Sequence, residues 1–127
     1  MAPRDNRGSI AFTADVEAAV RDADFVQESA PEREDLKISL LARIDRETRP
    51  DVIIASSTSG LLPTRLQSAM AQPERFTVGH PFNPVYLLPL VEICGGERTS
   101  AETKQAAVAF YERIGMRPLH VRKEIDG

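Results

Sequence analysis

A chain of 127 residues can form one domain with a modest hydrophobic core. Its composition, 42% hydrophobic and 28% charged, is that of an ordinary globular protein, and a net charge of -3 gives no basic surface for nucleic acid or an anionic membrane. No apolar run approaches a membrane span, and the single cysteine, Cys94, cannot form an internal disulfide, so a reducing cytoplasm is the simplest setting.

Strand-like and helix-like segments alternate along the chain, as hydrophobic periodicity and turn residues indicate. In chain order, the sequence predicts a strand at 10–12, a helix at 14–23, a strand at 25–27, a helix that starts after Ser29 and runs to about 48, a strand at 52–55, a helix at 63–70, strands at 76–79 and 90–94, a helix at 101–114 and a strand at 118–121. This alternation is typical of an α/β layer with a mainly parallel sheet.

Capping residues and apolar faces define the helices further. Thr13 can cap the first helix, and Ser29 with Glu32 has the spacing of a capping box for the second. The apolar positions expected on one side of the second helix are Leu36, Leu40, Leu41 and Ile44, and those expected on one face of the last helix are Ala107, Phe110, Tyr111 and Ile114.

One histidine and one glutamate lie at or within apolar runs. His80 ends the run that contains Phe76 and Val78, and Glu92 lies inside the next run. A carboxylate among apolar residues is costly unless it has a partner, and a carboxylate paired with histidine orients the ring and stabilises the imidazolium. The two residues therefore have the composition of a general base. The alternative interpretation is a surface histidine beside an edge glutamate.

Three polar segments follow predicted strands directly. These are Ser29, the segment Ser56–Gly60 and His80. Ligands of open α/β sheets bind beyond the carboxyl ends of the strands, so we expect the three segments to converge on one edge of the sheet.

Three ordered motifs carry a resemblance to a known family. They are Phe25–Glu32, Ser56–Leu61, and His80 with Phe82-Asn83-Pro84 followed by Glu92 twelve residues after the histidine. Together they resemble the L-3-hydroxyacyl-CoA dehydrogenase family. Details such as Gln27-Glu28-Ser29 and His80-Pro81 are similar to its L-carnitine dehydrogenase branch. The resemblance extends from about Ile10 to Gly127.

This resemblance implies an NAD-dependent oxidoreductase that converts a 3-hydroxy acid to the 3-oxo acid. L-carnitine is the expected substrate, and a 3-hydroxyacyl-CoA of fatty acid metabolism is the alternative. The implied catalytic residues are His80 as general base, Glu92 as the residue that orients it, and Ser59. The implied cofactor contacts are Ser29, Glu32, Lys37, Ser57 and Ser59, the implied substrate contacts are Ser59 and Asn83, and no metal site is expected.

Simpler interpretations remain for several of these residues. Glu32 and Lys37 also fit charge complementarity at a helix end and a solvated helix face, and Ser59 fits a turn residue before Gly60. Ser57 stands where many family members have asparagine and has a shorter side chain.

The seven glycines contain no Gly-x-Gly-x-x-Gly spacing. Residues 1–127 are therefore interpreted as a partial NAD-binding domain, the second half of a Rossmann-type doubly wound sheet, without the Gly-rich first βαβ unit and the C-terminal helical domain. The resemblance implies that the parent enzyme is a homodimer. As an isolated piece the chain is expected to be inactive, and a truncated remnant is the non-enzymatic alternative.

Overall fold

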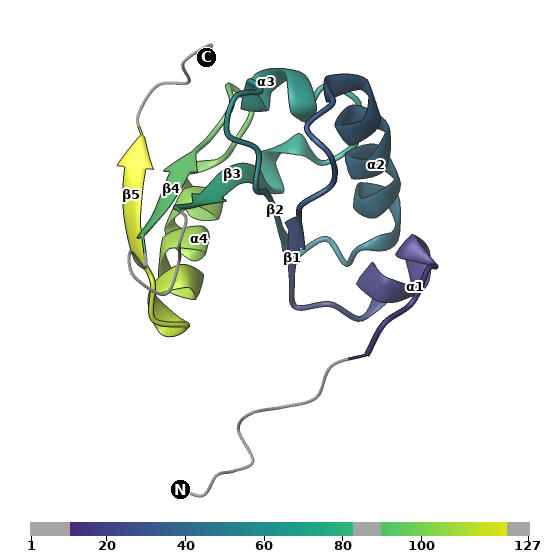
Figure 1. Ribbon diagram of the computed structural model, residues 1–127, viewed down its shortest axis with the longest axis horizontal. Coiled ribbons are helices and arrows are strands. Elements are labelled where there is room, and N and C mark those ends of the chain that lie inside the picture. The colour runs from purple at the N-terminus through teal and green to yellow at the C-terminus, as the bar shows by residue number, and fades with distance from the viewer. Residues whose placement is uncertain (1–10, 83–89, 122–127) are drawn as a thin grey trace, which may run out of the picture.

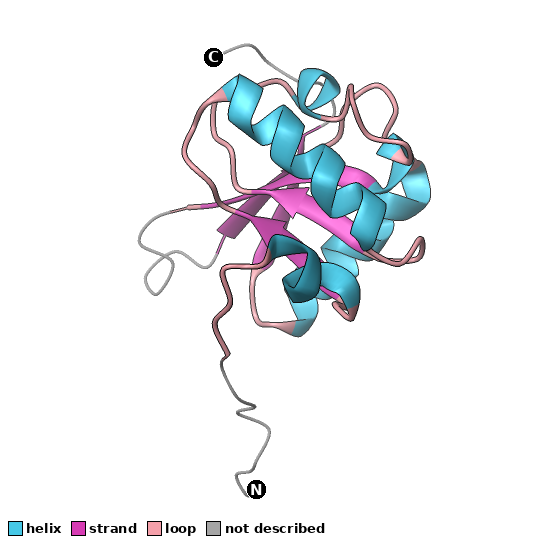
Figure 2. Ribbon diagram, turned by 90° about the vertical axis from the view of Figure 1, so that its right-hand side faces the viewer, coloured by secondary structure: helices cyan, strands magenta, loops and turns pink. Residues whose placement is uncertain are grey.

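The computed structural model describes residues 11–82 and 90–121, which form a five-stranded sheet with helices on both faces (Figures 1 and 2). The elements in chain order are α1 (Val16–Arg21), β1 (Phe25–Glu28), α2 (Glu34–Glu47), β2 (Ile53–Ser56), α3 (Pro63–Leu66), the 3-10 helix η2 (Pro73–Arg75), β3 (Phe76–Pro81), β4 (Leu90–Cys94), α4 (Ala101–Arg113) and β5 (Arg117–Val121). The expected α/β fold is confirmed.

The sheet has the strand order β1-β2-β3-β4-β5. β1, β2 and β3 are parallel, β4 is antiparallel to β3, and β5 is parallel to β4. The helical crossovers α2, α3 and α4 lie between the strands of parallel pairs, as parallel pairing requires. The predicted mainly parallel sheet is therefore confirmed, with one antiparallel pair at β3 and β4.

One face of the sheet packs against α2 and α3. Its core contains Leu41, Ile54, Leu66 and Phe76, none of which is exposed. The buried residues of α2 are Lys37, Leu41, Ile44 and Asp45, so two charged residues occupy core positions. The expected apolar face of this helix was wrong at Leu36, which is 36% exposed, because the helix turns its 37–41–44–45 side toward the sheet.

The opposite face packs against α4. Its buried core consists of Val91, Ile93, Ala107 and Tyr111, and the ring of Phe110 stacks on that of Phe25 with centroids 3.8 Å apart. Ile114 was expected on the buried face but is 56% exposed, because α4 ends at Arg113 and Ile114 is only its cap. Gly115 follows with φ 91, the left-handed conformation expected after a helix end.

The capping predictions were wrong at both N-termini. Asp15 caps α1 by accepting from Ala18 N, while the Thr13 hydroxyl accepts from Asp15 N before the helix begins. Arg33 precedes α2 and makes no side-chain cap hydrogen bond. Ser29 and Glu32 do not cap α2, because their side chains bond to residues that follow β2.

Two further elements differ from the expectation. Ala11 and Phe12 lie in no strand, and Phe12 is 93% exposed, while Ile10 lies outside the described residues. The helix predicted at 63–70 ends at Leu66, because a tighter turn follows in which Met70 N donates to Gln67 O.

A buried ion pair joins α2 to η2. The Arg75 and Asp45 side chains are 5% and 1% exposed, and Arg75 Nη2 lies 2.8 Å from Asp45 Oδ1. The other oxygen of Asp45 accepts from Ala71 N and Gln72 N. The guanidinium also donates to four backbone carbonyls, those of Asp45, Thr48, Arg49 and Val52. Every polar atom of the pair is therefore engaged, the condition under which a buried ion pair is tolerated.

Across residues 11–82 and 90–121, no helix is long and apolar enough to cross a membrane. The same residues contain no group of three or more His, Cys, Asp or Glu side chains that could hold a metal ion.

Candidate functional site

The ends of β1, β2 and β3 lie side by side because the three strands are parallel neighbours. Ser29 follows β1 and Ser57 follows β2, and their hydroxyl oxygens are 2.8 Å apart. Ser57 N also donates to Glu28 O at 2.8 Å. His80 lies near the end of β3, one residue after Gly79, whose carbonyl is bonded to the side chain of Gln27. Hydrogen bonds thus join Ser29, Ser57 and the residue directly before His80 at one edge of the sheet.

His80 and Glu92 are directly opposite in the antiparallel pair of β3 and β4. Opposite residues of such a pair project from the same face, with Cβ atoms about 4.5–5.5 Å apart. Both side chains are half-buried, and no hydrogen bond or ion pair joins them among the described residues. The ring of His80 lies 5.8 Å from that of Phe82. The register therefore makes the two residues neighbours, and the catalytic pair stays a prediction.

The turn that carries Ser59 is held by Glu32. Glu32 Oε2 accepts from Ser59 N and Gly60 N, both at 3.1 Å, and from the Thr58 hydroxyl. Burial opposes the ionisation of Glu32, but the hydrogen bonds from Thr58, Gly60 and Ser59 and the charge of Lys37 outweigh it, so the pKa of Glu32 lies below its ordinary value. Ser59 itself is exposed, on a turn whose backbone is held by hydrogen bonds to Glu32.

Lys37 lies under this turn and is 1% exposed. Its ammonium donates to Glu28 at 2.6 Å and to Ala30 O at 2.8 Å, and it forms an ion pair with Glu32 at 3.7 Å. Glu28 also accepts from the Ser56 hydroxyl. The solvated helix face considered for Lys37 is thus wrong: its charge is paired in the interior, where an unpaired charge would be very costly.

Glu28, Ser56 and Thr58 complete this network, although their sequence positions predicted no individual role for them. A signal was present at Glu28, since it shares a strand face with Val26 and both are buried. The alternation of a strand predicts this burial once the buried face is known. Asn83, expected on the substrate side, lies outside the described residues.

The polar groups at this edge suit the nicotinamide side of a dinucleotide. Ser29, Ser57 and Ser59 supply hydroxyls, which both donate and accept, next to a histidine and a carboxylate. The pyrophosphate of a dinucleotide is held by a glycine-rich turn at a helix N-terminus, and the sequence contains no such spacing. The residues present therefore fit one half of the cofactor.

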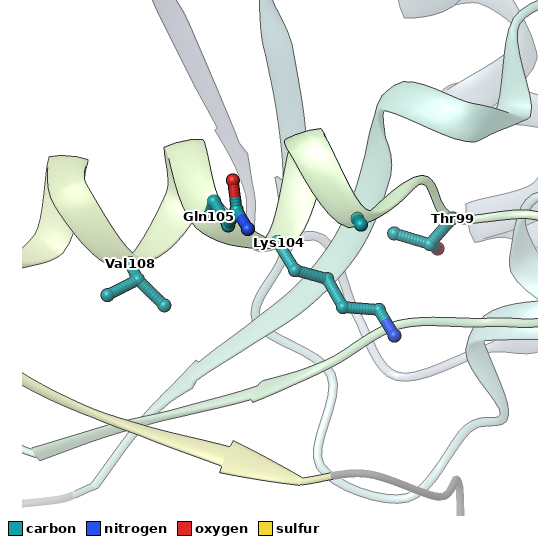
Figure 3. A pocket seen from close by; sticks show the side chains of 5 residues that line it. Thr99, Lys104, Gln105 and Val108 are labelled. Carbon is teal, nitrogen blue, oxygen red and sulfur yellow. The ribbon is translucent and has the colours of Figure 1, made fainter.

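A pocket of about 390 Å³ lies elsewhere, along one flank of α4 (Figure 3). Its lining residues are Thr99, Ala101, Lys104, Gln105 and Val108. None of them is among the polar residues at the ends of β1, β2 and β3, and α4 covers the face of the sheet opposite α2. This pocket is therefore separate from the predicted site.

Comparisons with known proteins identify the family of this chain. The family model of the 3-hydroxyacyl-CoA dehydrogenase NAD-binding domain matches residues 2–125. An L-carnitine dehydrogenase of Pseudomonas aeruginosa is 61% identical over 100% of this chain and 40% of its own length. One of Oceanobacillus iheyensis is 52% identical over 96% of this chain and 40% of its own length. The chain thus spans about 40% of the length of these two relatives.

Solved structures have the same fold. The 5-formyl-3-hydroxy-2-methylpyridine 4-carboxylic acid 5-dehydrogenase, described as an NAD+ dependent dismutase, is 35% identical with a TM-score of 0.87 over 94% of this chain and 38% of that one. The (S)-3-hydroxybutyryl-CoA dehydrogenase PaaH1 of Ralstonia eutropha is 35% identical with a TM-score of 0.81 over 88% of this chain and 39% of that one. The chain belongs to the family of 3-hydroxyacyl-CoA dehydrogenase NAD-binding domains, and NAD is the cofactor of that domain.

Proposed function

We propose that this chain forms part of an enzyme that oxidises L-carnitine to 3-dehydrocarnitine with NAD. The observation that carries the proposal is the register of β3 and β4, which sets His80 opposite Glu92 beside the strand ends that hold Ser29 and Ser57. The identity with L-carnitine dehydrogenases supports carnitine over other 3-hydroxy acids.

His80 acts as the general base in this proposal. One imidazole nitrogen accepts the proton of the substrate hydroxyl, and Glu92 accepts a hydrogen bond from the other nitrogen once the side chains close on substrate. The carboxylate thereby fixes the tautomer of the ring and stabilises the imidazolium that forms. NAD, when bound, takes up the hydride that leaves the substrate carbon.

Ser59 binds the reacting oxygen, and its exposed hydroxyl is available to do so because Glu32 holds the backbone of the turn. Ser29 and Ser57 contact the nicotinamide side of the cofactor. Glu32 and Lys37 belong to the same cofactor site. Asn83 contacts the substrate. In this proposal residues 1–127 are the second half of the NAD-binding domain, and the whole enzyme is a homodimer that binds a small-molecule substrate.

The proposal predicts the substrate preference of the full-length protein that carries this chain. NAD reduction with L-carnitine should be faster than with 3-hydroxybutyryl-CoA at equal concentration, because the match to the carnitine branch includes the residues around His80 and Ser59. The absorbance of NADH follows both reactions. D-carnitine serves as a control, since it has the same charges with inverted configuration at the reacting carbon. A strong preference for the thioester would assign the protein to the 3-hydroxyacyl-CoA dehydrogenases instead.

A further inference from the structure

The side-chain amide of Gln27 connects the three strand ends. Gln27 lies on β1, and its Nε2 donates to Ser57 Oγ at 2.8 Å and to Gly79 O at 2.9 Å. The backbone pairing of β2 with β3 ends at Ser56 and Val78, so the amide bonds the next carbonyl along β3. That carbonyl belongs to the residue directly before His80. A single side chain thus bridges the cofactor-side serine and the strand of the proposed base.

The chemistry of the partners fixes the direction of the three hydrogen bonds made by the side-chain amide of Gln27. A backbone carbonyl only accepts, so the amide nitrogen of Gln27 faces Gly79 and its oxygen faces Tyr111. Tyr111 therefore donates to Gln27 Oε1. Because Nε2 places one proton on Ser57 Oγ, the hydroxyl proton of Ser57 points away from Gln27. It is directed to Ser29 or to a ligand at the strand ends.

Tyr111 is suited to be the fixed donor to Gln27 in this hydrogen-bond network. It is 2% exposed on α4, and its ring packs edge-on against Phe25 and Phe110. Burial raises the pKa of Tyr111 above its ordinary range, although the hydrogen bond with Gln27 acts in the opposite direction. The phenol is therefore protonated at neutral pH and can donate to Gln27.

Gly79 leaves the space that the tyrosine needs. A Cβ added at this position would lie 2.2 Å from the hydroxyl oxygen and 2.9 Å from Cζ of Tyr111. The ring is held by packing against two other aromatic residues, so it cannot retreat cheaply. Glycine here leaves room for the hydroxyl of Tyr111, on the face of the sheet that α4 covers, to reach Gln27.

We propose that Gln27 and Tyr111 are positioning residues of the NAD site, which act through Ser57 by presenting its hydroxyl as a hydrogen-bond donor to the cofactor. The inference rests on the proposed function, since it takes Ser57 as a cofactor contact. It also explains how a residue as short as Ser57 serves this position: the amide behind it supplies the orientation that a longer side chain would need to supply itself.

The test is a double-mutant cycle on the full-length protein, with the dissociation constant of NADH read from its fluorescence. Tyr111→Phe removes one oxygen and should raise that constant roughly fivefold to tenfold, the effect of one oriented hydrogen bond. Ser57→Ala should raise it similarly. The double variant should bind NADH no more weakly than the weaker single variant, because both changes remove the same contact. A purely structural role of Tyr111 would give no such coupling.

Thr77→Val is the matched control. Thr77 carries a fully buried hydroxyl on the same face of β3 as Gly79, and this hydroxyl donates to the carbonyls of Val78 and Cys94. It should leave NADH binding within about twofold of the unchanged protein. Unchanged binding in Tyr111→Phe, additive losses in the double variant, or an equal loss in Thr77→Val would each overturn the inference. If the coupling is retained but neither L-carnitine nor 3-hydroxybutyryl-CoA supports NAD reduction, only the proposed substrate is overturned. Failure of the unchanged protein to bind NADH would overturn both.

Discussion

Replacing His80 with glutamine is expected to lower the turnover number of the full-length protein by roughly 10²–10⁴-fold, the usual contribution of general acid–base catalysis. Glutamine keeps much of the size and hydrogen-bonding capacity of the imidazole but cannot take up a proton. The position of His80 in β3, opposite Glu92 in β4, is the motivation. Steady-state rates at saturating NAD and substrate measure the effect.

Two controls separate chemistry from binding and folding. The dissociation constant of NADH and the midpoint of thermal unfolding should change little in His80→Gln, because the described contacts of His80 are limited to its strand pairing and the ring of Phe82. Glu92→Gln should reduce turnover less than His80→Gln, since it removes the residue that orients the base and leaves the base itself. Near-native turnover in purified His80→Gln would remove His80 from the mechanism.

The second large effect concerns stability. Asp45→Asn is expected to lower the free energy of unfolding by about 3–5 kcal/mol, the usual cost of breaking a buried ion pair from one side. Both oxygens of Asp45 accept hydrogen bonds, one from Arg75 and the other from Ala71 N and Gln72 N. The amide group of asparagine would therefore face a donor at either position. Urea unfolding, followed by circular dichroism, measures the change.

Glu47→Gln on the same helix is the matched control. Glu47 forms an ion pair with Arg21 at 3.3 Å, but the two side chains are 37% and 59% exposed. An exposed pair of this kind contributes less than about 1 kcal/mol. Two results would contradict this prediction: equal losses of unfolding free energy in the two variants, or an unfolding free energy of Asp45→Asn close to that of the unchanged chain. Either would show that the buried ion pair of Asp45 and Arg75 does not stabilise the fold more than an exposed pair does.

The fold was predictable because it depends on periodic patterns that are local in the sequence. The apolar runs at 52–55 and 90–94 identified strands to within about a residue, and the spacing of Ala107 and Tyr111 identified the buried side of α4. The expectation that strand ends would converge needed only the rule that parallel strands share one carboxyl edge. β3 ends at Pro81 and β4 begins at Leu90, a separation too short for the crossover that a parallel pair needs, so antiparallel pairing follows from the chain.

The polar interior was not predictable in the same way. A solvated helix face was the simpler interpretation of Lys37, and no prediction was made for Asp45. Both lie on the buried side of α2, because each meets a complementary charge on another part of the fold. The capping box at Ser29 and Glu32 failed for the same reason: the loop after β2 offers these side chains better partners than the start of α2. Such competition between local and tertiary partners cannot be resolved from spacing.

The link between Tyr111 and Gln27 is the extreme case, since the two residues are 84 positions apart. Helical periodicity placed Tyr111 on a buried face and gave no reason for its hydroxyl. A buried phenol requires a partner, so the sequence did imply that one exists. Only the close approach across Gly79 identifies that partner as the residue behind Ser57.

A crystal structure of the full-length protein with NAD bound tests the central claim most directly. The account predicts that the nicotinamide ring lies beyond the carboxyl ends of β1, β2 and β3, with Ser57 donating a hydrogen bond to the cofactor. Its reactive carbon would then lie on the same side of the sheet as His80 and Glu92. A nicotinamide ring bound in the α4 pocket beside Thr99 and Lys104, or anywhere out of reach of Ser57 and His80, would contradict it.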